Sequence, residues 1–518
     1  MNKITWRRSK RRLLVVSNRL PVSIKSSEGR REIRPGAGGL VTALAPIVRN
    51  TRGVWIGWPG CELTPEVLEL IRNYNIEKSF DLQAVNLTEE EVQNYYLGFS
   101  NEALWPLFHD LLGQCMFEGV HWEVYKNVNR KFAEKIVEAV QPGDLIWIHD
   151  YHLILVAHYL RQMNVDHPLA FFLHTPFPGY DLLRRLPWKD RILGGLLDFD
   201  LVGFQTLRDR RNFCRSAKEL MPELYIKAFY RHSIVRHGRR EIKVGNFPIS
   251  IDFSEFNDGA QIEEVEREAS FLRNKCQSRS LMLGVDRLDY TKGIPERFLA
   301  YERALEKYPE LRGNICLLQL AVPSRSHLSA YQDIRETLEW MVGRINGRFS
   351  EFGWQPIQYI YRSVSRTELL GFYRACDIGL LTPLRDGMNL VAKEFCASTV
   401  DNNGVLILSE FAGASEQLAK GAIMVNPYNR EETADAIYRA YKMELEERER
   451  MMTVLRSEVK RNDIFRWVEW FLSSFREHER EEAASEIHPN NSKPVNDRVE
   501  SSIMESIKSG GGGSYTDD

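Results

Sequence analysis

Short apolar segments alternate along the chain with stretches whose apolar residues recur at helical spacing. In the first half, apolar runs occupy residues 13–17, 54–58, 85–87, 144–149, 169–173, 200–204 and 242–246. In the second half, comparable runs occupy residues 281–285, 314–321, 357–361, 378–381, 404–408 and 422–426. Continuous apolar runs of this length indicate strands buried on both faces of a parallel sheet, with helices between them. The pattern therefore predicts an α/β protein with two halves, each built on its own sheet, that face each other across a cleft.

The alternation of predicted strands and helices is interrupted at one place, and we put the domain boundary there. Residues 247–252, Phe-Pro-Ile-Ser-Ile-Asp, are typical of a connector, and a polar, Glu-rich stretch follows them. The predicted domains cover residues 13–248 and residues 249–475, the second closing with an apolar helix. Residues 1–12 are expected to form a basic tail. Residues 476–518 are predicted to be a disordered tail with a Gly/Ser linker, because they hold too little apolar surface to order themselves.

Composition narrows the class of protein. The chain has 518 residues, of which 43% are hydrophobic and 27% are charged, as expected of a globular protein with two large domains. The formal net charge of −2 provides no global basic field for nucleic acid, and no apolar stretch approaches the length of a membrane span. The seven cysteines contain no C-x-x-C pair, which argues for a reducing compartment and against disulfides or zinc. We therefore expect a cytoplasmic protein that binds neither nucleic acid nor membranes.

Polar residues follow several of the predicted strands, and ligands of open α/β sheets bind beyond those strand ends. In the first half, Asp150 and His174 follow two successive apolar runs. In the second half, Arg287 and Lys292 share the loop after the first run, and two cations on one loop suit a diphosphate. Each of these residues taken alone is as well explained by an ordinary structural role, so only their accumulation favours a ligand site.

The densest of these strand ends is residues 382–394, Thr-Pro-Leu-Arg-Asp-Gly-Met-Asn-Leu-Val-Ala-Lys-Glu. A buried strand passes through a glycine turn into a helix, so free backbone N–H groups point beyond the sheet. Asp386 and Glu394 add acceptors that suit the hydroxyl groups of a sugar or a ribose. A glycine-rich loop at residues 35–40 also opens a helix and can approach a phosphate through its backbone, although it is neither a Walker loop nor a dinucleotide fingerprint.

Taken together, these motifs resemble the trehalose-6-phosphate synthase family of retaining glucosyltransferases, which have a GT-B fold. The resemblance covers the chain from Leu13 to about residue 475. It rests on the motifs Ser17-Asn-Arg-Leu-Pro21, Gly38-Gly-Leu40, Phe99-Ser-Asn101, Leu104-Trp-Pro106, Ile148-His-Asp-Tyr-His152, Phe172-Leu-His-Thr-Pro-Phe-Pro178, Arg287-Leu-Asp-Tyr-Thr-Lys-Gly293 and Leu384-Arg-Asp-Gly-Met-Asn-Leu-Val-Ala-Lys-Glu394. Agreement at all of these positions is not credible by chance. The resemblance implies a GT-B fold with two Rossmann-like domains, the first for the acceptor and the second for the nucleotide-sugar donor.

The resemblance also implies a division of labour among residues. The donor, UDP-glucose, is expected to contact Gly39, His174, Arg287, Lys292, Asp386, Gly387, Met388, Asn389, Leu390, Val391 and Glu394. Within this set the two cations would hold the diphosphate, and Glu394 would bind the ribose. The acceptor, glucose-6-phosphate, is expected to contact Arg19, Tyr96, Trp105, Asp150 and Arg325, with the two arginines gripping its phosphate. The residues expected to act at the reacting bond are His174, Asp386, Arg287 and Lys292.

The implied activity is transfer of glucose from UDP-glucose to glucose-6-phosphate with retention, giving trehalose 6-phosphate and UDP. No cofactor and no catalytic metal are expected. The sequence stops without the phosphatase domain that some relatives carry, so a separate phosphatase is expected to process the product. Whether the protein forms a homo-oligomer is left open.

Three alternatives stay open at this point. The donor site can serve another phosphorylated acceptor, such as glycerol-3-phosphate or a cyclitol phosphate. The chain can also be a catalytically silent sugar-phosphate sensor, or a GT-B-fold epimerase of sugar nucleotides. Departures from the family pattern at residues 35–37 and 179–188 leave the donor nucleotide open among UDP, ADP and GDP.

Overall fold

The structure is a computed structural model that describes residues 11–27, 30–36, 39–78, 81–277, 279–325 and 329–487. It divides into two compact units, Met1–Phe471 and Leu472–Asp518, and every contact reported below lies within the first unit. Most of the predicted basic tail, and the predicted C-terminal tail beyond residue 487, lie outside the described residues.

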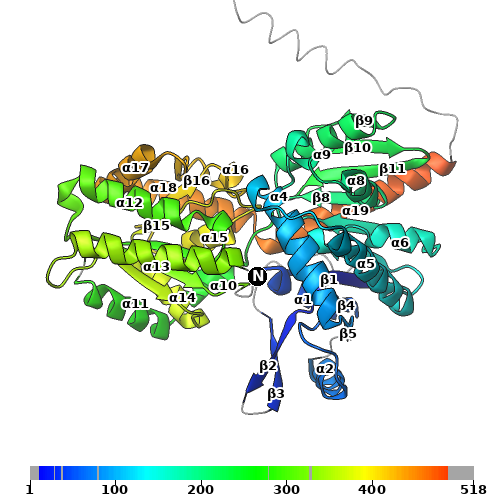
Figure 1. Cartoon of the computed structure of the whole chain (residues 1–518), viewed down its shortest axis with the longest axis horizontal. Coiled ribbons are helices and arrows are strands. Elements are labelled where there is room, and N and C mark those ends of the chain that lie inside the picture. Colours follow the sequence, from blue (N-terminus) through cyan, green and yellow to red (C-terminus); the bar gives the residue numbers. More distant parts are fainter. Residues whose placement is uncertain are drawn as a thin grey trace, which may run out of the picture. The chain divides into compact units, whose positions relative to one another are not determined.

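The first unit contains two large sheets and one hairpin (Figure 1). The first sheet has nine strands in the order β5-β4-β1-β6-β7-β8-β11-β10-β9. Neighbouring strands from β5 to β11 are parallel, whereas β10 and β9 are added antiparallel. Its strands are β1 (Leu13–Arg19), β4 (Val54–Trp58), β5 (Asp81–Ala84), β6 (Leu145–His149), β7 (Leu169–Phe172), β8 (Leu201–Phe204), β9 (Tyr225–Ala228), β10 (His232–His237) and β11 (Arg240–Asn246).

The second sheet has six strands, all parallel, in the order β14-β13-β12-β15-β16-β17. Its strands are β12 (Ser280–Arg287), β13 (Ile315–Val322), β14 (Ile357–Tyr361), β15 (Ile378–Leu381), β16 (Val405–Ser409) and β17 (Ile423–Val425). The hairpin pairs β2 (Val22–Ser27) with β3 (Arg30–Pro35).

The order of strands reverses once in the parallel part of each sheet. In the first sheet the reversal lies between β1 and β6, and in the second it lies between β12 and β15. At such a point the loops of two adjacent strands diverge to opposite faces and leave a crevice beyond the strand ends, where ligands of open α/β sheets bind. The topology alone therefore directs attention to the loops that follow these four strands.

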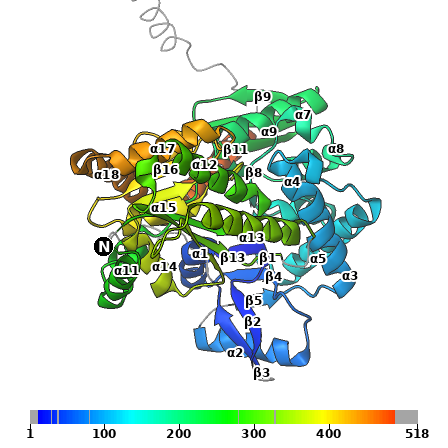
Figure 2. The ribbon, with the colours of Figure 1, turned by 60° about the vertical axis from the view of Figure 1, so that its left-hand side comes forward.

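Helices flank both sheets (Figures 1 and 2). In the first half they are α1 (Gly39–Asn50), α2 (Pro65–Lys78), α3 (Glu89–Glu91), the π-helix η2 (Val92–Leu104), α4 (Trp105–Phe108), η3 (Leu112–Gln114), α5 (Gly119–Ala139), η4 (Tyr151–Leu153), α6 (Val156–Gln162), α7 (Tyr180–Leu183), α8 (Lys189–Leu197) and α9 (Leu207–Leu220). In the second half they are α10 (Phe253–Gly259), α11 (Glu263–Lys275), η5 (Tyr290–Lys292), α12 (Ile294–Lys307), η6 (Pro309–Leu311), α13 (Ser329–Phe349), α14 (Arg366–Ala375), α15 (Leu390–Ser398), α16 (Ser415–Leu418), α17 (Arg430–Lys442), α18 (Leu445–Arg461) and α19 (Ile464–Ile487).

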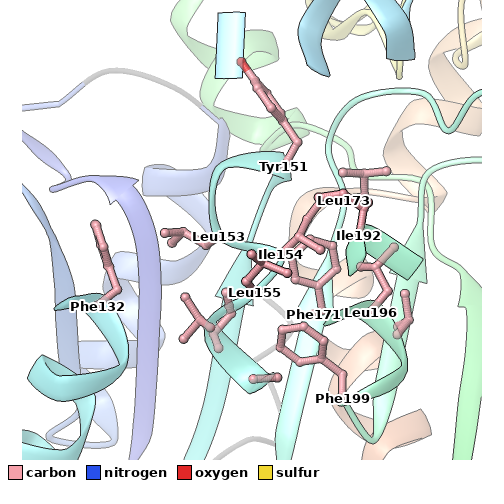
Figure 3. Packing of buried hydrophobic residues seen from close by; sticks show 14 of the residues in the cluster. Phe132, Tyr151, Leu153, Ile154, Leu155, Phe171, Leu173, Ile192, Leu196 and Phe199 are labelled. Atoms are coloured by element: carbon pink, nitrogen blue, oxygen red, sulfur yellow. The ribbon is translucent and has the colours of Figure 1, made fainter. Parts of the chain in front are cut away.

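Each sheet buries its own hydrophobic cluster, as the apolar runs predict. Figure 3 shows part of the first cluster, in which Ile154, Phe171 and Phe199 lie close together while the hydroxyl of Tyr151 points away from them. That hydroxyl donates to Asn101 Oδ1 at 3.0 Å. Burial of the ring thus anchors a residue of the loop after β6, and its hydroxyl is held by Asn101.

The first turns of α19 return the chain to the first sheet. Trp467 Nε1 donates to the carbonyl of Phe247 at 3.0 Å, and the ring of Phe471 stacks on Trp147 with 4.3 Å between centroids. The predicted closing helix is therefore present. It continues as far as Ile487, so twelve residues of the segment predicted to be disordered, 476–487, are helical. The predicted domain boundary at 247–253 stays a prediction.

Two local predictions differ from the structure. The strand expected at residues 85–87 lies earlier, at β5, because β4 pairs with residues 81–84 from Val54 onward. The aromatic-rich segment that begins at Tyr95 forms a π-helix, which no apolar periodicity had indicated. In the described part of the chain, the longest apolar helices fall short of what is needed to cross a membrane.

Candidate active site

Residues that the sequence singled out follow the strands at both reversal points. Asp150 follows β6, and Arg19 ends β1 in the first sheet. Arg287 ends β12, and Asp386 lies in the loop after β15 in the second sheet. Because the carboxyl ends of parallel strands lie at one edge of a sheet, each pair of residues lies at the crevice of its own sheet.

The loops after β12 and β15 bring two of the expected donor residues into contact. Lys292 Nζ donates to Asp386 Oδ2 at 2.6 Å, with both side chains about seven-eighths buried. Gly293 allows this approach, because it has φ +61° and a Cβ there would lie 2.4 Å from the Thr382 carbonyl oxygen. Burial raises the pKa of Asp386, but Lys292 and the hydrogen bonds of the carboxylate lower it below its usual value. Asp386 is therefore a carboxylate acceptor at neutral pH.

Helix α15 starts directly after this ion pair. Asn389 caps the helix with φ +78°, accepting from Ala392 N at 3.0 Å and donating to Asp386 at 3.2 Å. The preceding Met388 is buried, whereas Leu390 and Val391 in the first turn are half-buried. The unpaired N–H groups of a helix start are therefore held beside the Asp386 carboxylate, a suitable place for a hydroxyl-rich ligand.

Glu394 lies one turn further along α15 and has a partner that the sequence did not indicate. Tyr373 of α14 is fully buried and donates its hydroxyl to Glu394 Oε2 at 2.7 Å. Burial raises the pKa of Glu394, and the hydrogen bond from Tyr373 lowers it. One carboxylate oxygen is thus held by the tyrosine while the side chain stays half-buried.

His174 of the first sheet approaches the turn of the second sheet. A Cβ on Gly387 would lie 2.2 Å from the carbonyl oxygen of His174, so only glycine permits the two backbones to lie this close. The His174 ring lies 3.2 Å, Nε2 to Nδ1, from His149, which ends β6. Burial lowers the pKa of His174 to about 3. Burial, with a smaller effect of His174, also holds the pKa of His149 well below its usual value. Both rings are therefore neutral at pH 7 and able to donate or accept one hydrogen bond at each nitrogen.

Trp105 lies close to two of the arginines that are expected to bind phosphate groups. The guanidinium of Arg325 lies 4.1 Å from the Trp105 ring centroid, and that of Arg287 lies 5.9 Å from it. Arg325 donates to Tyr331 at 2.7 Å and to Tyr151 at 3.3 Å. The cation expected at the donor diphosphate and the cation expected at the acceptor phosphate therefore share one aromatic ring.

One buried carboxylate lies at the centre of these cations. Asp289 is 1% exposed and lies 3.5 Å from Arg325. Burial would raise its pKa, but Arg325, Arg287 and Lys292 together lower it below its usual value. Asp289 thus lies within the field of three cations, of which Lys292 also pairs with Asp386.

A cavity of about 910 Å³ opens beside this cluster. Its lining includes Arg19, Trp58, Tyr96 and Arg325, three of which were expected to bind the acceptor. Arg19 is exposed, lies 4.6 Å from the Trp58 ring centroid and covers the backbone of Gly60. The volume is within the range of small-molecule sites, which is about 300–1,000 Å³.

Asp150 has an unusual backbone conformation at the edge of this site. Its φ is +75°, and its Oδ1 accepts from the backbone N–H of His174 at 3.2 Å. Burial raises the pKa of Asp150 to about 6, against the lowering effect of its hydrogen bonds and of Arg325 and Arg287. Strained backbone at a strand end is typical of functional sites, since the rest of the fold holds it in place.

The structure thus brings together most of the predicted residues and adds several. Gly39 is the first residue of α1, but the neighbouring residues 37 and 38 lie outside the described part of the chain, so its expected contact stays a prediction. Sequence analysis missed Trp58, His149, Asp289, Tyr331 and Tyr373. Trp58, His149 and Asp289 end or follow strands, so the strand-end rule could have found them, whereas the two tyrosines lie inside helices and have no such signal.

No group of three or more His, Cys, Asp or Glu side chains among the described residues could hold a metal ion. The expectation that the reaction needs no catalytic metal stays a prediction.

Two α/β sheets, the second parallel throughout and the first largely so, with cations and carboxylates on the loops at their reversal points, fit a GT-B glycosyltransferase. The model of glycosyltransferase family 20 matches residues 11–477. The chain therefore belongs to glycosyltransferase family 20, as the sequence motifs predict.

Individual relatives support this assignment. A bifunctional trehalose-6-phosphate synthase/phosphatase of Thermoproteus tenax is 41% identical over 474 residues, covering 89% of this chain and 63% of the relative, so the chain spans less than two thirds of that protein. A trehalose-6-phosphate synthase of Mycobacterium sp. (strain JLS) is 42% identical over 467 residues, covering 89% of this chain and 95% of the relative. Among solved structures, an alpha,alpha-trehalose-phosphate synthase (UDP-forming) from Burkholderia xenovorans in complex with glucose-6-phosphate has a TM-score of 0.80 and 35% identity, covering 90% of this chain and all of the other.

Proposed function

We propose that this chain transfers glucose from UDP-glucose to glucose-6-phosphate with retention, giving trehalose 6-phosphate and UDP. The observation that carries the proposal is the arrangement around Trp105, where Arg287 and Arg325 lie 5.9 and 4.1 Å from one ring centroid. A diphosphate and a phosphate monoester bound to these arginines would bring a donor and an acceptor sugar to the same place. The match to family 20 and to a UDP-forming relative in complex with glucose-6-phosphate supports both substrates.

On the donor side, Arg287 and Lys292 bind the diphosphate, and the backbone at Gly39 approaches it. Asp386 and the N–H groups from Gly387 to Val391 take the glucose hydroxyls, the neutral ring of His174 binds another, and Glu394 binds the ribose. The largely buried Lys292–Asp386 pair supports these roles, because it joins the residue assigned to the diphosphate to the residue assigned to the sugar. As the glycosyl–phosphate bond breaks, the two cations neutralise the charge that develops on UDP.

On the acceptor side, Arg19 and Arg325 bind the phosphate, while Tyr96, Trp105 and Asp150 contact the sugar. The anomeric hydroxyl of the acceptor forms the new bond to glucose, and its proton passes to the departing phosphate oxygen on the same face, which retains configuration. The reaction balances without a metal, a cofactor or an oxidant. The cavity lined by Arg19, Tyr96 and Arg325 supports the acceptor assignment.

We place the reaction in the cytoplasm, because the seven cysteines of the chain are all free thiols. A separate phosphatase would then consume the product. The bifunctional relative from T. tenax supports a link between the two activities.

The test is mass spectrometry of products from UDP-glucose incubated in parallel with glucose-6-phosphate, with glycerol-3-phosphate and without acceptor. A disaccharide phosphate in the first incubation alone is the expected result. A product in the second alone would keep the donor site and overturn the acceptor. Binding of UDP-glucose without any product would favour a sensor, and parallel incubations with ADP-glucose and GDP-glucose decide the nucleotide.

A further inference from the structure

Arg385 precedes Asp386 in the loop after β15, and the proposed function gives it no role. Its side chain is 6% exposed. It extends from the second sheet to two carboxylates of the first half, with Nη2 3.7 Å from Asp209 Oδ1 and Nε 3.3 Å from Asp110 Oδ2. Arg385, the neighbour of the proposed sugar-binding residue Asp386, thus forms ion pairs with two carboxylates of the first half.

Asp209 connects this arginine to the loop that carries His174. It is 2% exposed and lies in the first turn of α9. Its Oδ1 accepts from the backbone N–H of Phe177 at 3.0 Å, and its Oδ2 accepts from the Thr206 hydroxyl at 2.5 Å. Phe177 lies three positions after His174 in the loop after β7. The carboxylate that meets Arg385 therefore also holds the His174 loop.

Asp110 connects the same arginine to the acceptor side. It lies in the turn after α4, the helix that begins with Trp105. Its φ is +62°, a backbone conformation that is uncommon for residues other than glycine. Burial raises the pKa of Asp110 and of Asp209, and Arg385 lowers both. Without the arginine, the buried carboxylate of Asp209 would lose its charge partner, and so would the more exposed carboxylate of Asp110.

The backbones meet at the same place. The close approach of Gly387 to the His174 carbonyl joins the two loops directly, and the backbone N–H of Leu207, at the start of α9, donates to Glu416 Oε2 at 3.2 Å. A cavity of about 90 Å³ beside this junction is lined by Asp209, Arg385 and Asp386 among others. The junction is therefore small and polar, and the Arg385–Asp209 pair within it is buried, unlike an ordinary surface ion pair.

We propose that Arg385, through Asp209 and Asp110, is a positioning residue that sets Asp386 and His174 at the separation needed to hold one glucosyl group between them. It touches neither substrate, and its effect depends on the glucosyl group being present. This inference rests on the proposed function, since it assigns the donor sugar to Asp386 and His174.

The test compares Arg385→Met, the charge-conserving Arg385→Lys, Asp209→Asn and the double variant Arg385→Met/Asp209→Asn. The matched control is Arg374→Met, because Arg374 pairs with Asp401 at 3.2 Å within the second half alone. Each protein is measured for kcat and donor KM, for affinity towards UDP and UDP-glucose by calorimetry, and for Tm. UDP reports on the nucleotide site without the glucosyl group.

We expect Arg385→Met to lower kcat/KM by about 10- to 100-fold and to weaken the binding of UDP-glucose, while UDP affinity changes less than about 3-fold, as removal of one partner of a buried ion pair implies. Arg385→Lys should recover part of this loss, and the double variant should lose less than the product of the single effects. The control should match the wild type in all five measurements.

Two outcomes would overturn the inference. One is a kcat/KM for Arg385→Met within about 3-fold of the wild type, given that removal of one partner of a buried ion pair costs more. The other is an equal loss for UDP and UDP-glucose together with a lower Tm, which is what a structural role alone produces. If Arg385→Met does not fold, Arg385→Lys and Asp209→Asn decide by the same criteria. A wild type that forms no disaccharide phosphate refutes the proposed function, whereas the ratio of UDP-glucose to UDP affinity still tests the positioning role.

Discussion

Lys292 and Asp386 form an ion pair of 2.6 Å although they lie 94 positions apart on the loops of two different strands. The ammonium that we assign to the diphosphate neutralises the carboxylate that we assign to the sugar. A bound donor would contact both Lys292 and Asp386, so this one ion pair would take part in recognising the nucleotide and the glucosyl group.

Replacement of Asp386 should separate these two parts of donor recognition. Asp386→Asn removes a charged acceptor for the sugar but leaves Lys292 free for the diphosphate. A hydrogen bond to a charged group contributes about 1.5–3 kcal/mol, so kcat/KM for UDP-glucose should fall by about 10- to 150-fold. Calorimetry with UDP should show affinity equal to or above that of the wild type. Equal losses for UDP and UDP-glucose would contradict the assignment of Asp386 to the sugar.

Arg325→Ala should act mainly on the phosphorylated acceptor. The arginine is held over Trp105 by Tyr331, and its removal leaves Asp289 with one cation fewer. We expect the KM for glucose-6-phosphate to rise by about 10- to 100-fold, with a smaller change in donor KM. Arg335→Ala is the matched control, because Arg335 pairs with Glu339 on the surface of α13. If the wild type already uses glucose and glucose-6-phosphate equally well, the phosphate is not recognised and this prediction fails.

Tyr373→Phe tests the role of Glu394 by removing a single hydroxyl. The carboxylate would lose its 2.7 Å donor, so its pKa would rise further above the usual value and its orientation would be less fixed. The donor KM should increase by about 3- to 10-fold with kcat little changed, since one neutral donor is worth about 1 kcal/mol. With a donor that lacks the ribose hydroxyls, the variant and the wild type should have the same KM. A defect that persists with that donor would show that Tyr373 acts elsewhere.

Acceptor binding should depend on pH through Asp150. Its pKa is raised to about 6, so the carboxylate becomes protonated as pH falls through 6 and then accepts hydrogen bonds from sugar hydroxyls less strongly. The phosphate of glucose-6-phosphate also titrates near pH 6, with a second pKa of about 6. The effect of Asp150 on acceptor binding is therefore the difference between the pH profiles of acceptor affinity for the wild type and for Asp150→Asn. We expect the acid limb of this profile to be steeper in the wild type. Parallel profiles would remove Asp150 from acceptor binding.

The same shift has a defined sign for stability. The folded-state pKa of Asp150 lies above the usual 3.8, so the folded protein binds the additional proton between about pH 4 and pH 6. The contribution of Asp150 to stability is thus present below this window and lost as pH rises through it. Asp150→Asn should flatten this part of the stability profile.

Arg297 should matter for folding and not for substrate recognition. Its side chain is fully buried and donates to Asp286 at 2.5 Å, to Gln319 at 2.8 Å and to Thr382 at 3.1 Å. Arg297→Met leaves the Asp286 charge buried without a cation, which costs about 3–5 kcal/mol. Urea unfolding should show this loss, and Arg297→Met/Asp286→Leu should recover most of it.

The exposed pair of Arg303 and Glu431 provides the comparison for that experiment. Arg303→Met should change stability by no more than about 1 kcal/mol, as is usual for surface ion pairs. Equal effects of the two arginine substitutions would show that the buried network of Arg297 is not important for stability.

Much of the site could be predicted because it lies at strand ends. Apolar runs identify the strands, and the carboxyl-end rule then places Asp150, His174, Arg287 and Asp386 at one edge of each sheet. The rule says nothing about helix interiors, which is why Tyr373 and Tyr331 were missed. The strand expected at residues 85–87 was wrong for a related reason, because the register with β4 is decided by pairing and not by local apolar content.

The sequence by itself determined the alternation of strands and helices, the two-sheet architecture and the membership of family 20, because these depend on local periodicity and on short motifs. Only the tertiary structure decided which charges meet and how they titrate. Arg385 lies 176 positions from Asp209 along the chain, and no local pattern could pair them. The pKa of Asp150 likewise depends on burial by segments far away in sequence. The hydration of a charged group and its distance from remote charges are decided only when the chain packs. These two quantities set the pKa values and therefore the chemistry of the site.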